Sequence, residues 1–175
     1  VYIQGFFQAP HQLSEHVYVL SCKRGTNEIK QTMPIWGSKY GVWPASYMAL
    51  TCLCAYRLTQ DERLLNWAAS VGEGYVSEVF PQDVQAPAMD AGLGIGVLAD
   101  LYDITGDQKW LDAGLDLSER VMGLYLDNPL PRGATGIDWY ESQMGPSFLL
   151  HGLARVALLA RFGRPCHLEA DYTAR

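Results

Sequence analysis

Two neighbouring stretches near the middle of the chain show opposite patterns of apolar and polar residues. Residues 91–99 contain no charged side chain, which is typical of a helix buried on all sides. The next stretch repeats apolar residues every three or four positions with acids and bases between them, which predicts a helix with one face in water. Its apolar residues are Trp110, Ala113, Leu117, Val121 and Leu124. Between the two, Gly106 can end one helix and Asp107 can cap the next, so we expect a helical hairpin.

This hairpin pattern recurs along the chain. Residues 56–65 align with residues 102–111 at a shift of 46 positions, with Tyr, Thr, Asp and Leu in register. A looser third copy reaches Gly163, and uncharged stretches at 40–56 and 142–154 supply the other buried helices. Repeats of this length are typical of stacked helical units. We therefore predict an all-α fold of repeated hairpins forming part of a double ring, with the third hairpin cut short.

The first 37 residues do not follow the helical pattern. Residues 16–20 and 29–35 could form two strands around a turn at 23–27, with Pro34 confining the second strand to a sheet edge. They could equally be extended segments wrapped over the helices. We expect an irregular or β segment at 1–37 and a helical domain at 38–175.

Composition narrows the partners of the protein. The chain is 49% hydrophobic with a net charge of −6, which argues against nucleic acid and against an anionic membrane surface. No signal peptide is visible and the chain opens on Val1, so we expect a soluble mature protein or an excised fragment whose location the sequence does not give.

We read Cys22, Cys52, Cys54 and Cys166 as thiols rather than a disulfide framework. Since Cys166-His167 has no second ligand pair at zinc spacing, we expect no metal and no cofactor.

Two motifs resemble a known family. Asp90, Leu98-Ala99, Thr105-Gly106-Asp107 and Trp110-Leu111 are similar to a segment of the unsaturated glucuronyl and rhamnogalacturonyl hydrolases, and residues 145–154 are similar to a second segment of the same families. The resemblance implies a six-hairpin (α/α) toroid, of which this chain would supply about half. Met144 stands where the family usually has Arg, and Pro146-Ser147 where it has Gln-Ala.

Asp90 is the first candidate for chemistry. A carboxylic acid at the mouth of an apolar ring is desolvated, which raises its pKa toward the range in which it can donate a proton and later accept one. The resemblance implies that Asp90 protonates the double bond of an unsaturated uronic acid and then activates water. The alternative is that Asp90 only caps a helix opening at Ala91.

A second group of candidates lies at the entrance of the third uncharged helix. Hydrolysis by two carboxylates would pair Asp90 with Asp138 or Glu141, although both could simply be solvated loop or capping charges. Aromatic residues nearby suit the apolar faces of sugar rings, but Trp43 and Tyr47, four apart on one predicted helix, could equally be core packing. The candidates for substrate binding are Trp43, Tyr47, Trp139, Tyr140 and His151, with Trp36 as a further lining residue.

These expectations favour a carbohydrate-active hydrolase, or a fragment of one, acting on an acidic or unsaturated uronyl oligosaccharide. The first alternative is a non-catalytic helical-repeat module that binds a glycan or a protein. The second is a sugar epimerase on the same scaffold, for which only His151 could supply a histidine base. Because a half-ring leaves helix flanks uncovered, we also expect a homo-oligomer or a missing remainder of the chain.

Overall fold

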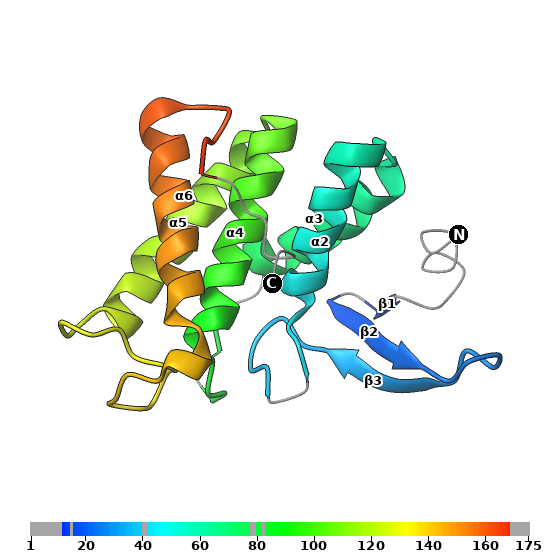
Figure 1. Cartoon of the computed structure of the whole chain (residues 1–175), viewed down its shortest axis with the longest axis horizontal. Helices are drawn as coiled ribbons and strands as arrows, with labels where there is room; N and C mark the ends of the chain where they lie inside the picture. The colour runs from blue at the N-terminus through cyan, green and yellow to red at the C-terminus, as the bar shows by residue number, and fades with distance from the viewer. Residues whose placement is uncertain (1–11, 15, 40–41, 78–79, 82, 169–175) are drawn as a thin grey trace.

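The computed structural model describes residues 12–14, 16–39, 42–77, 80–81 and 83–168, and within them the chain is mostly helical. Three strands come first, followed by five long α-helices and a short 3-10 helix (Figure 1). The elements are β1 (Gln12–Ser14), β2 (Val17–Cys22), β3 (Ile29–Met33), α2 (Ala45–Thr59), α3 (Glu62–Ser77), α4 (Ala88–Thr105), α5 (Gln108–Tyr125), η1 (Ser142–Met144) and α6 (Pro146–Phe162).

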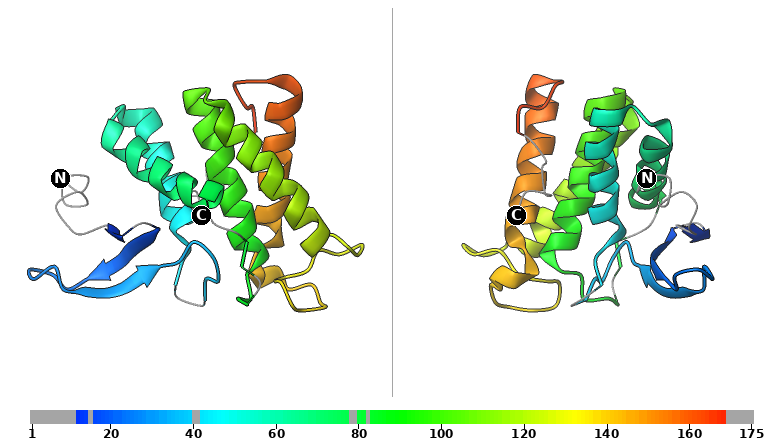
Figure 2. Two further views of the ribbon diagram at one scale, coloured as in Figure 1. Left: turned by 180° about the vertical axis from the view of Figure 1, so that it is seen from behind. Right: turned by 45° about the vertical axis from the view of Figure 1, so that its right-hand side comes forward.

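Helix α4 is the centre of the helical layer. It contacts α2, α3, α5 and α6, and every residue from 90 to 101 is buried. Helices α2, α4 and α6 start at the same end of the molecule, and the views from the front and from behind place α3 and α5 on one side of them (Figures 1 and 2). Lys109, Asp112 and Glu119 on α5 are exposed. The prediction of a mostly helical chain is therefore confirmed, and the amphipathic helices α3 and α5 pack against the largely apolar helix α4.

Glycines allow the inner helices to approach closely. A side-chain carbon added to Gly92 of α4 would lie 2.2 Å from backbone atoms of Phe148 and Leu149 on α6, and one added to Gly152 would lie 2.5 Å from the carbonyl oxygen of Gly92. Apolar side chains of the inner helices fill the space between them: Ala49, Leu53, Leu98 and Leu149 are 0% exposed, while Leu153 is half-buried.

The turns between helices follow the predicted repeat. Gly106 takes a left-handed conformation with φ 73°, and the next helix is capped by the carboxylate of Asp107, which accepts from the Lys109 N–H at 3.1 Å. At the matching position after α2, Gln60 is also left-handed, with φ 57°. After α6, the N–H of Gly163 donates to the Leu159 carbonyl at 2.9 Å. One boundary was wrong: α6 begins at Pro146, a favourable first residue because proline lacks the N–H that a helix start leaves unused.

The N-terminal strands form an antiparallel sheet in the order β1-β2-β3, which confirms the strand interpretation and places the second predicted strand at an edge. The sheet is tied to the helices by Tyr18, whose hydroxyl donates to the Ser70 carbonyl at 2.8 Å and whose ring packs edge-on against Trp67 with centroids 5.3 Å apart.

Two further observations concern the helices. Cys52 is buried in the core, and burial raises the pKa of its thiol to about 12, so it stays protonated. Among the residues that the structure describes, no helix has the length and apolar character needed to cross a membrane.

Candidate functional site

Asp90 lies in the first turn of α4 and is 0% exposed. Its carboxylate accepts a hydrogen bond from the Ser38 N–H at 2.8 Å and another from the Ser38 hydroxyl. The helix begins at Ala88, and its N-cap position is occupied by Pro87 without a side-chain cap. The alternative that Asp90 caps a helix opening at Ala91 is therefore wrong, because its side chain reaches across to the segment before α2 instead.

Burial changes the acidity of Asp90. Desolvation raises the pKa of its carboxyl from 3.8 to about 6, although hydrogen bonds from Ser38 and the Gly37 backbone pull in the opposite direction. None of the described residues forms an ion pair with the Asp90 carboxylate. A carboxyl with a pKa in this range can exchange a proton near neutral pH, as a general acid and base must.

A second buried carboxylate on the same helix, that of Asp100, differs from Asp90 in having ion-pair partners. Asp100 is also 0% exposed, but Arg57 of α2 contacts both of its oxygens at 3.0 and 3.1 Å. Arg155 of α6, only 1% exposed, donates to the same carboxylate. This ion cluster joins the three inner helices toward their C-terminal ends. The buried negative charge of Asp100 is therefore balanced by arginines, whereas that of Asp90 is not.

Sequence reasoning missed the Arg57–Asp100–Arg155 cluster. Its sequence signal is one charged residue directly after each of the three uncharged stretches, and the Arg155 and Asp100 partners stand 55 residues apart. A lone charge within a predicted buried helix requires a partner, because an unpaired buried charge is costly. That rule could have flagged Asp100 and Arg155 as a pair.

A surface pocket of about 390 Å³ lies in the loop between α5 and α6 and is lined by Asn128, Pro129, Leu130, Arg132, Asp138, Trp139 and Tyr140. Trp139 is 62% exposed and Tyr140 is 47% exposed. Exposed aromatic rings beside polar groups suit the apolar faces and hydroxyls of a sugar. The pocket therefore brings two of the predicted binding residues together with one predicted carboxylate.

Arg132 holds the pocket loop in shape. Its guanidinium donates to both oxygens of Asp127, at 2.8 and 2.5 Å, and to the Ile137 carbonyl at 2.9 Å. It also donates to Asp138. The hydrogen bonds that Arg132 donates to Asp127 and Asp138 raise its pKa further above the ordinary value. These hydrogen bonds cross-link the two ends of the loop.

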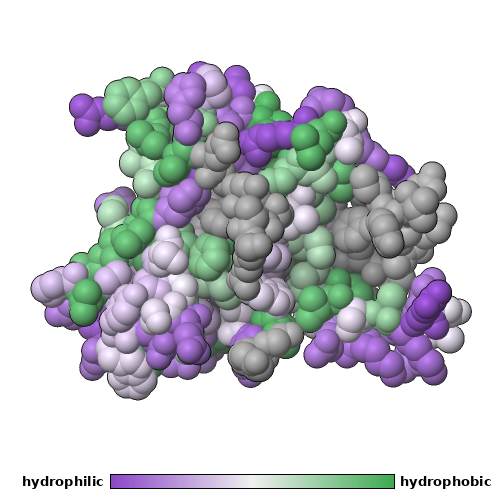
Figure 3. Space-filling view, in the orientation of Figure 1, coloured by the Kyte–Doolittle hydropathy of each residue, from purple (hydrophilic) through white to green (hydrophobic). Residues whose placement is uncertain are grey.

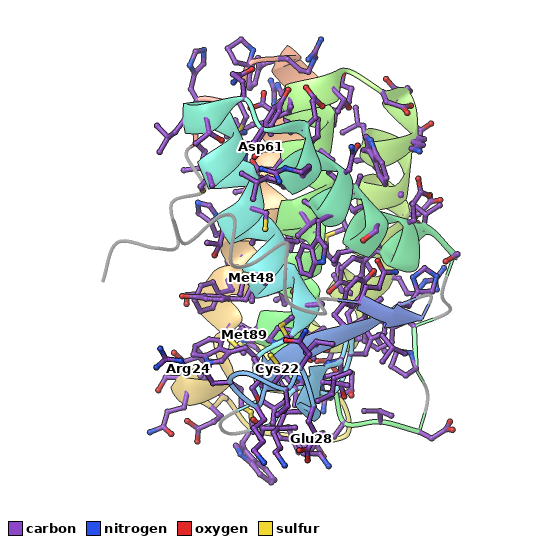
Figure 4. The ribbon with its side chains drawn as sticks, turned by 90° about the vertical axis from the view of Figure 1, so that its right-hand side faces the viewer. Cys22, Arg24, Glu28, Met48, Asp61 and Met89 are labelled. Atoms are coloured by element: carbon purple, nitrogen blue, oxygen red, sulfur yellow. The ribbon has the colours of Figure 1, made fainter. Side chains whose placement is uncertain are left out.

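The pocket loop is anchored next to Asp90. The Ala88 N–H donates to the Gly133 carbonyl at 2.8 Å, and the Thr135 N–H donates to the Ala86 carbonyl at 2.9 Å. Figure 4 places Met89, the neighbour of Asp90, toward the end of the molecule that holds the β-hairpin, and Asp61 at the opposite end. Asp90 and the pocket loop therefore belong to the same end of the inner helices.

The other predicted carboxylates have local partners. The side chain of Asp138 is 89% exposed and paired with Arg132. Glu141 caps η1 by accepting from the Gln143 N–H at 3.0 Å. These contacts match the alternative roles predicted for both residues, a solvated loop charge and a capping charge.

The remaining candidates are half-buried. Trp43 precedes α2, so the assumption that it shares a helix with Tyr47 was wrong, but the two rings still pack with centroids 4.6 Å apart. Trp36 packs edge-on against Tyr75 with ring centroids 5.0 Å apart. His151 lies on α6 and is half-buried.

Neither a metal site nor a known relative identifies the chain. Within the described residues, no group of three or more His, Cys, Asp or Glu side chains could hold a metal ion. No family model, curated protein or solved structure matches the chain.

Proposed function

We propose that this chain is a carbohydrate-active hydrolase, or part of one, that acts on an acidic or unsaturated uronyl oligosaccharide with Asp90 as its acid and base. The observation that carries the proposal is the uncompensated burial of Asp90 beside a loop with exposed aromatic rings. The resemblance of the Asp90 and 145–154 motifs to the uronyl hydrolases supports it, and so does the two-layer helical packing, which is compatible with half of a six-hairpin ring.

In the proposed reaction, the protonated Asp90 carboxyl gives its proton to one carbon of the substrate's double bond. Water then adds to the other carbon, which bears the ring oxygen, and returns a proton to the carboxylate, so the acid is regenerated. The hemiketal that forms opens the sugar ring, and the hemiacetal left at the anomeric carbon then breaks the glycosidic C–O bond and releases the second sugar as an alcohol. A pKa of about 6 keeps a large fraction of Asp90 protonated in weakly acidic solution and makes its conjugate base strong enough to accept the proton back. Trp139 and Tyr140 would hold a sugar ring by stacking.

Substrate access requires a local rearrangement at Ser38. Both Asp90 oxygens are occupied by Ser38, and Asp90 is 0% exposed. The Ser38 segment must therefore move away when substrate enters, and the sugar would take over the hydrogen bonds that Ser38 gives.

The test compares wild type, Asp90→Asn and the control Asp112→Asn, which changes an exposed carboxylate on the outer helix α5. The amide introduced by Asp90→Asn can still accept from the Ser38 N–H and donate to its hydroxyl, so folding should be preserved. Turnover of an unsaturated uronyl disaccharide, followed as loss of its conjugated-alkene absorbance, should fall by a factor on the order of 10³ for Asp90→Asn and stay unchanged for Asp112→Asn. Equal rates for all three proteins would remove Asp90 from the mechanism.

The enclosure of Asp90 favours a second candidate, a non-catalytic module that binds a glycan through the pocket loop. This candidate predicts no turnover by wild type, together with binding of an oligosaccharide that Trp139→Ala weakens. Because Trp139 is 62% exposed, its replacement should leave the thermal unfolding midpoint nearly unchanged. Calorimetric titration of both proteins separates lost binding from lost folding.

A further inference from the structure

Helix α6 leaves one long face uncovered. Its residues toward α4 are buried, whereas Leu150 is 49% exposed, Leu158 is 36% exposed and Phe162 is 72% exposed. These residues follow at steps of four on the helix, with exposed Ala154 between the first two. Figure 3 shows apolar side chains reaching the surface at the edge of the molecule where Figure 1 places α6. The face carries one charge, that of Arg161.

Helix α2 presents a second uncharged face at the other edge of the inner layer. Leu58 on this face is 87% exposed. The rest of the face is half-buried and also uncharged, and consists of Tyr47, Met48, Thr51, Cys54 and Ala55. Both edges of the three-helix layer, α2 and α6, therefore present mainly apolar side chains.

Leu58 and Phe162 are the most exposed large hydrophobic side chains among the described residues. Each lies in the last turn of its helix. Since α2 and α6 start at the same end of the molecule, both side chains lie toward its other end (Figure 1). Exposed apolar faces of this kind mark interaction surfaces.

We propose that a second copy of the chain covers both faces, with α6 of each copy packed against α2 of the other. This contact continues the packing of parallel inner helices already made by α2 with α4 and by α4 with α6. A two-fold axis along the helices makes the contact twice, so neither apolar edge is left open. An α6–α6 contact related by a two-fold axis would leave both α2 faces exposed.

The area fits a weak but specific dimer. A 17-residue helix is about 25 Å long, and packed helices are separated by about 10 Å. Each helix face then covers about 250 Å², and the four faces of a closed pair bury about 1,000 Å², near the lower limit for a specific interface.

The pair would also place its two candidate sites at one end. A two-fold axis along the helices keeps the Asp90 ends of both copies on the same side. The dimer itself does not depend on Asp90 being catalytic.

Charge substitutions at the two edges test the arrangement. Leu58→Lys and Phe162→Glu each disrupt both contacts of a pair, because every contact contains one copy of each edge. An equimolar mixture restores the pair, because one contact then joins the introduced lysine to the introduced glutamate and the other is wild type at both positions. Met122→Lys, at a side chain on the outer helix α5 that is 46% exposed, is the matched control.

Sedimentation velocity at 5–100 µM gives the outcomes. We expect twice the mass of one chain for wild type, Met122→Lys and the mixture, and one chain mass for each edge variant alone, with unchanged circular dichroism. A wild-type monomer would overturn the proposal and would mean that another protein segment covers the apolar faces of α2 and α6. A dimeric Leu58→Lys protein, or a mixture that stays monomeric, would overturn the α6–α2 contact. Larger open assemblies of wild type would overturn two-fold closure.

Discussion

The buried charge of Asp90 should make the protein less stable at neutral pH than in weak acid, and Asp90→Asn should remove this dependence. The pKa of Asp90 is raised from 3.8 to about 6 in the folded state. The folded protein therefore holds this proton more tightly than the unfolded chain does. The resulting stabilisation is fully present below pH 3.8 and is lost as the pH rises through 6.

The magnitude follows from the two pKa values. Raising the pKa from 3.8 to about 6 corresponds to about 3 kcal/mol in the free energy of unfolding. The amide of the variant keeps the hydrogen bonds with Ser38 and carries no charge. Compared with wild type, Asp90→Asn should therefore gain about 2.4 kcal/mol of stability between pH 4 and pH 7, with most of the gain between pH 4 and 6.

Urea unfolding of both proteins, followed by circular dichroism at pH 4, 5, 6, 7 and 8, measures this gain. Taking the difference between variant and wild type cancels the titration of the other groups. A difference that is constant across this range, or a variant that becomes less stable relative to wild type as the pH rises, would show that folding does not raise the pKa of Asp90.

Two glycines and one ion cluster give further predictions. Gly92→Ala should cost about 3 kcal/mol or more, because its new carbon meets backbone atoms of α6 at 2.2 Å, whereas Gly123→Ala in open space on α5 should gain about 1 kcal/mol. Urea unfolding that ranks the two glycine variants equally would contradict the close α4–α6 packing. Asp100→Asn should cost about 3–5 kcal/mol by leaving Arg155 buried without a counter-charge, and a thermal unfolding midpoint close to that of wild type would contradict this.

The hairpins could be predicted because their signals are local. Gly106 and Asp107 act within a few residues of their own positions. The repeat at a shift of 46 residues aligns Gln60 with Gly106, so it predicts the turn after α2 as well. Helix α6 was predicted to start too early because residues 142–145 are as uncharged as the first half of the helix, residues 146–154. Only the left-handed Gly145 and the favourable position of Pro146 fix the boundary.

The candidate site could be predicted only in part. An acid at the start of an uncharged helix indicated a desolvated Asp90, and the structure places it in such surroundings. Its partner Ser38 stands 52 residues away in a segment with no regular pattern, so no periodicity could identify it. The same holds for Arg132, whose contacts with Asp127 and Asp138 depend on the fold of one irregular loop.

The dependence of kcat/KM on pH for an unsaturated uronyl disaccharide tests the central claim most directly. If Asp90 is the proton donor, kcat/KM for wild type should fall as the pH rises through about 6, the pKa of its carboxyl, and Asp90→Asn should show almost no turnover at any pH. A rate that stays level from pH 5 to pH 8, or that Asp90→Asn reproduces, would contradict the assignment.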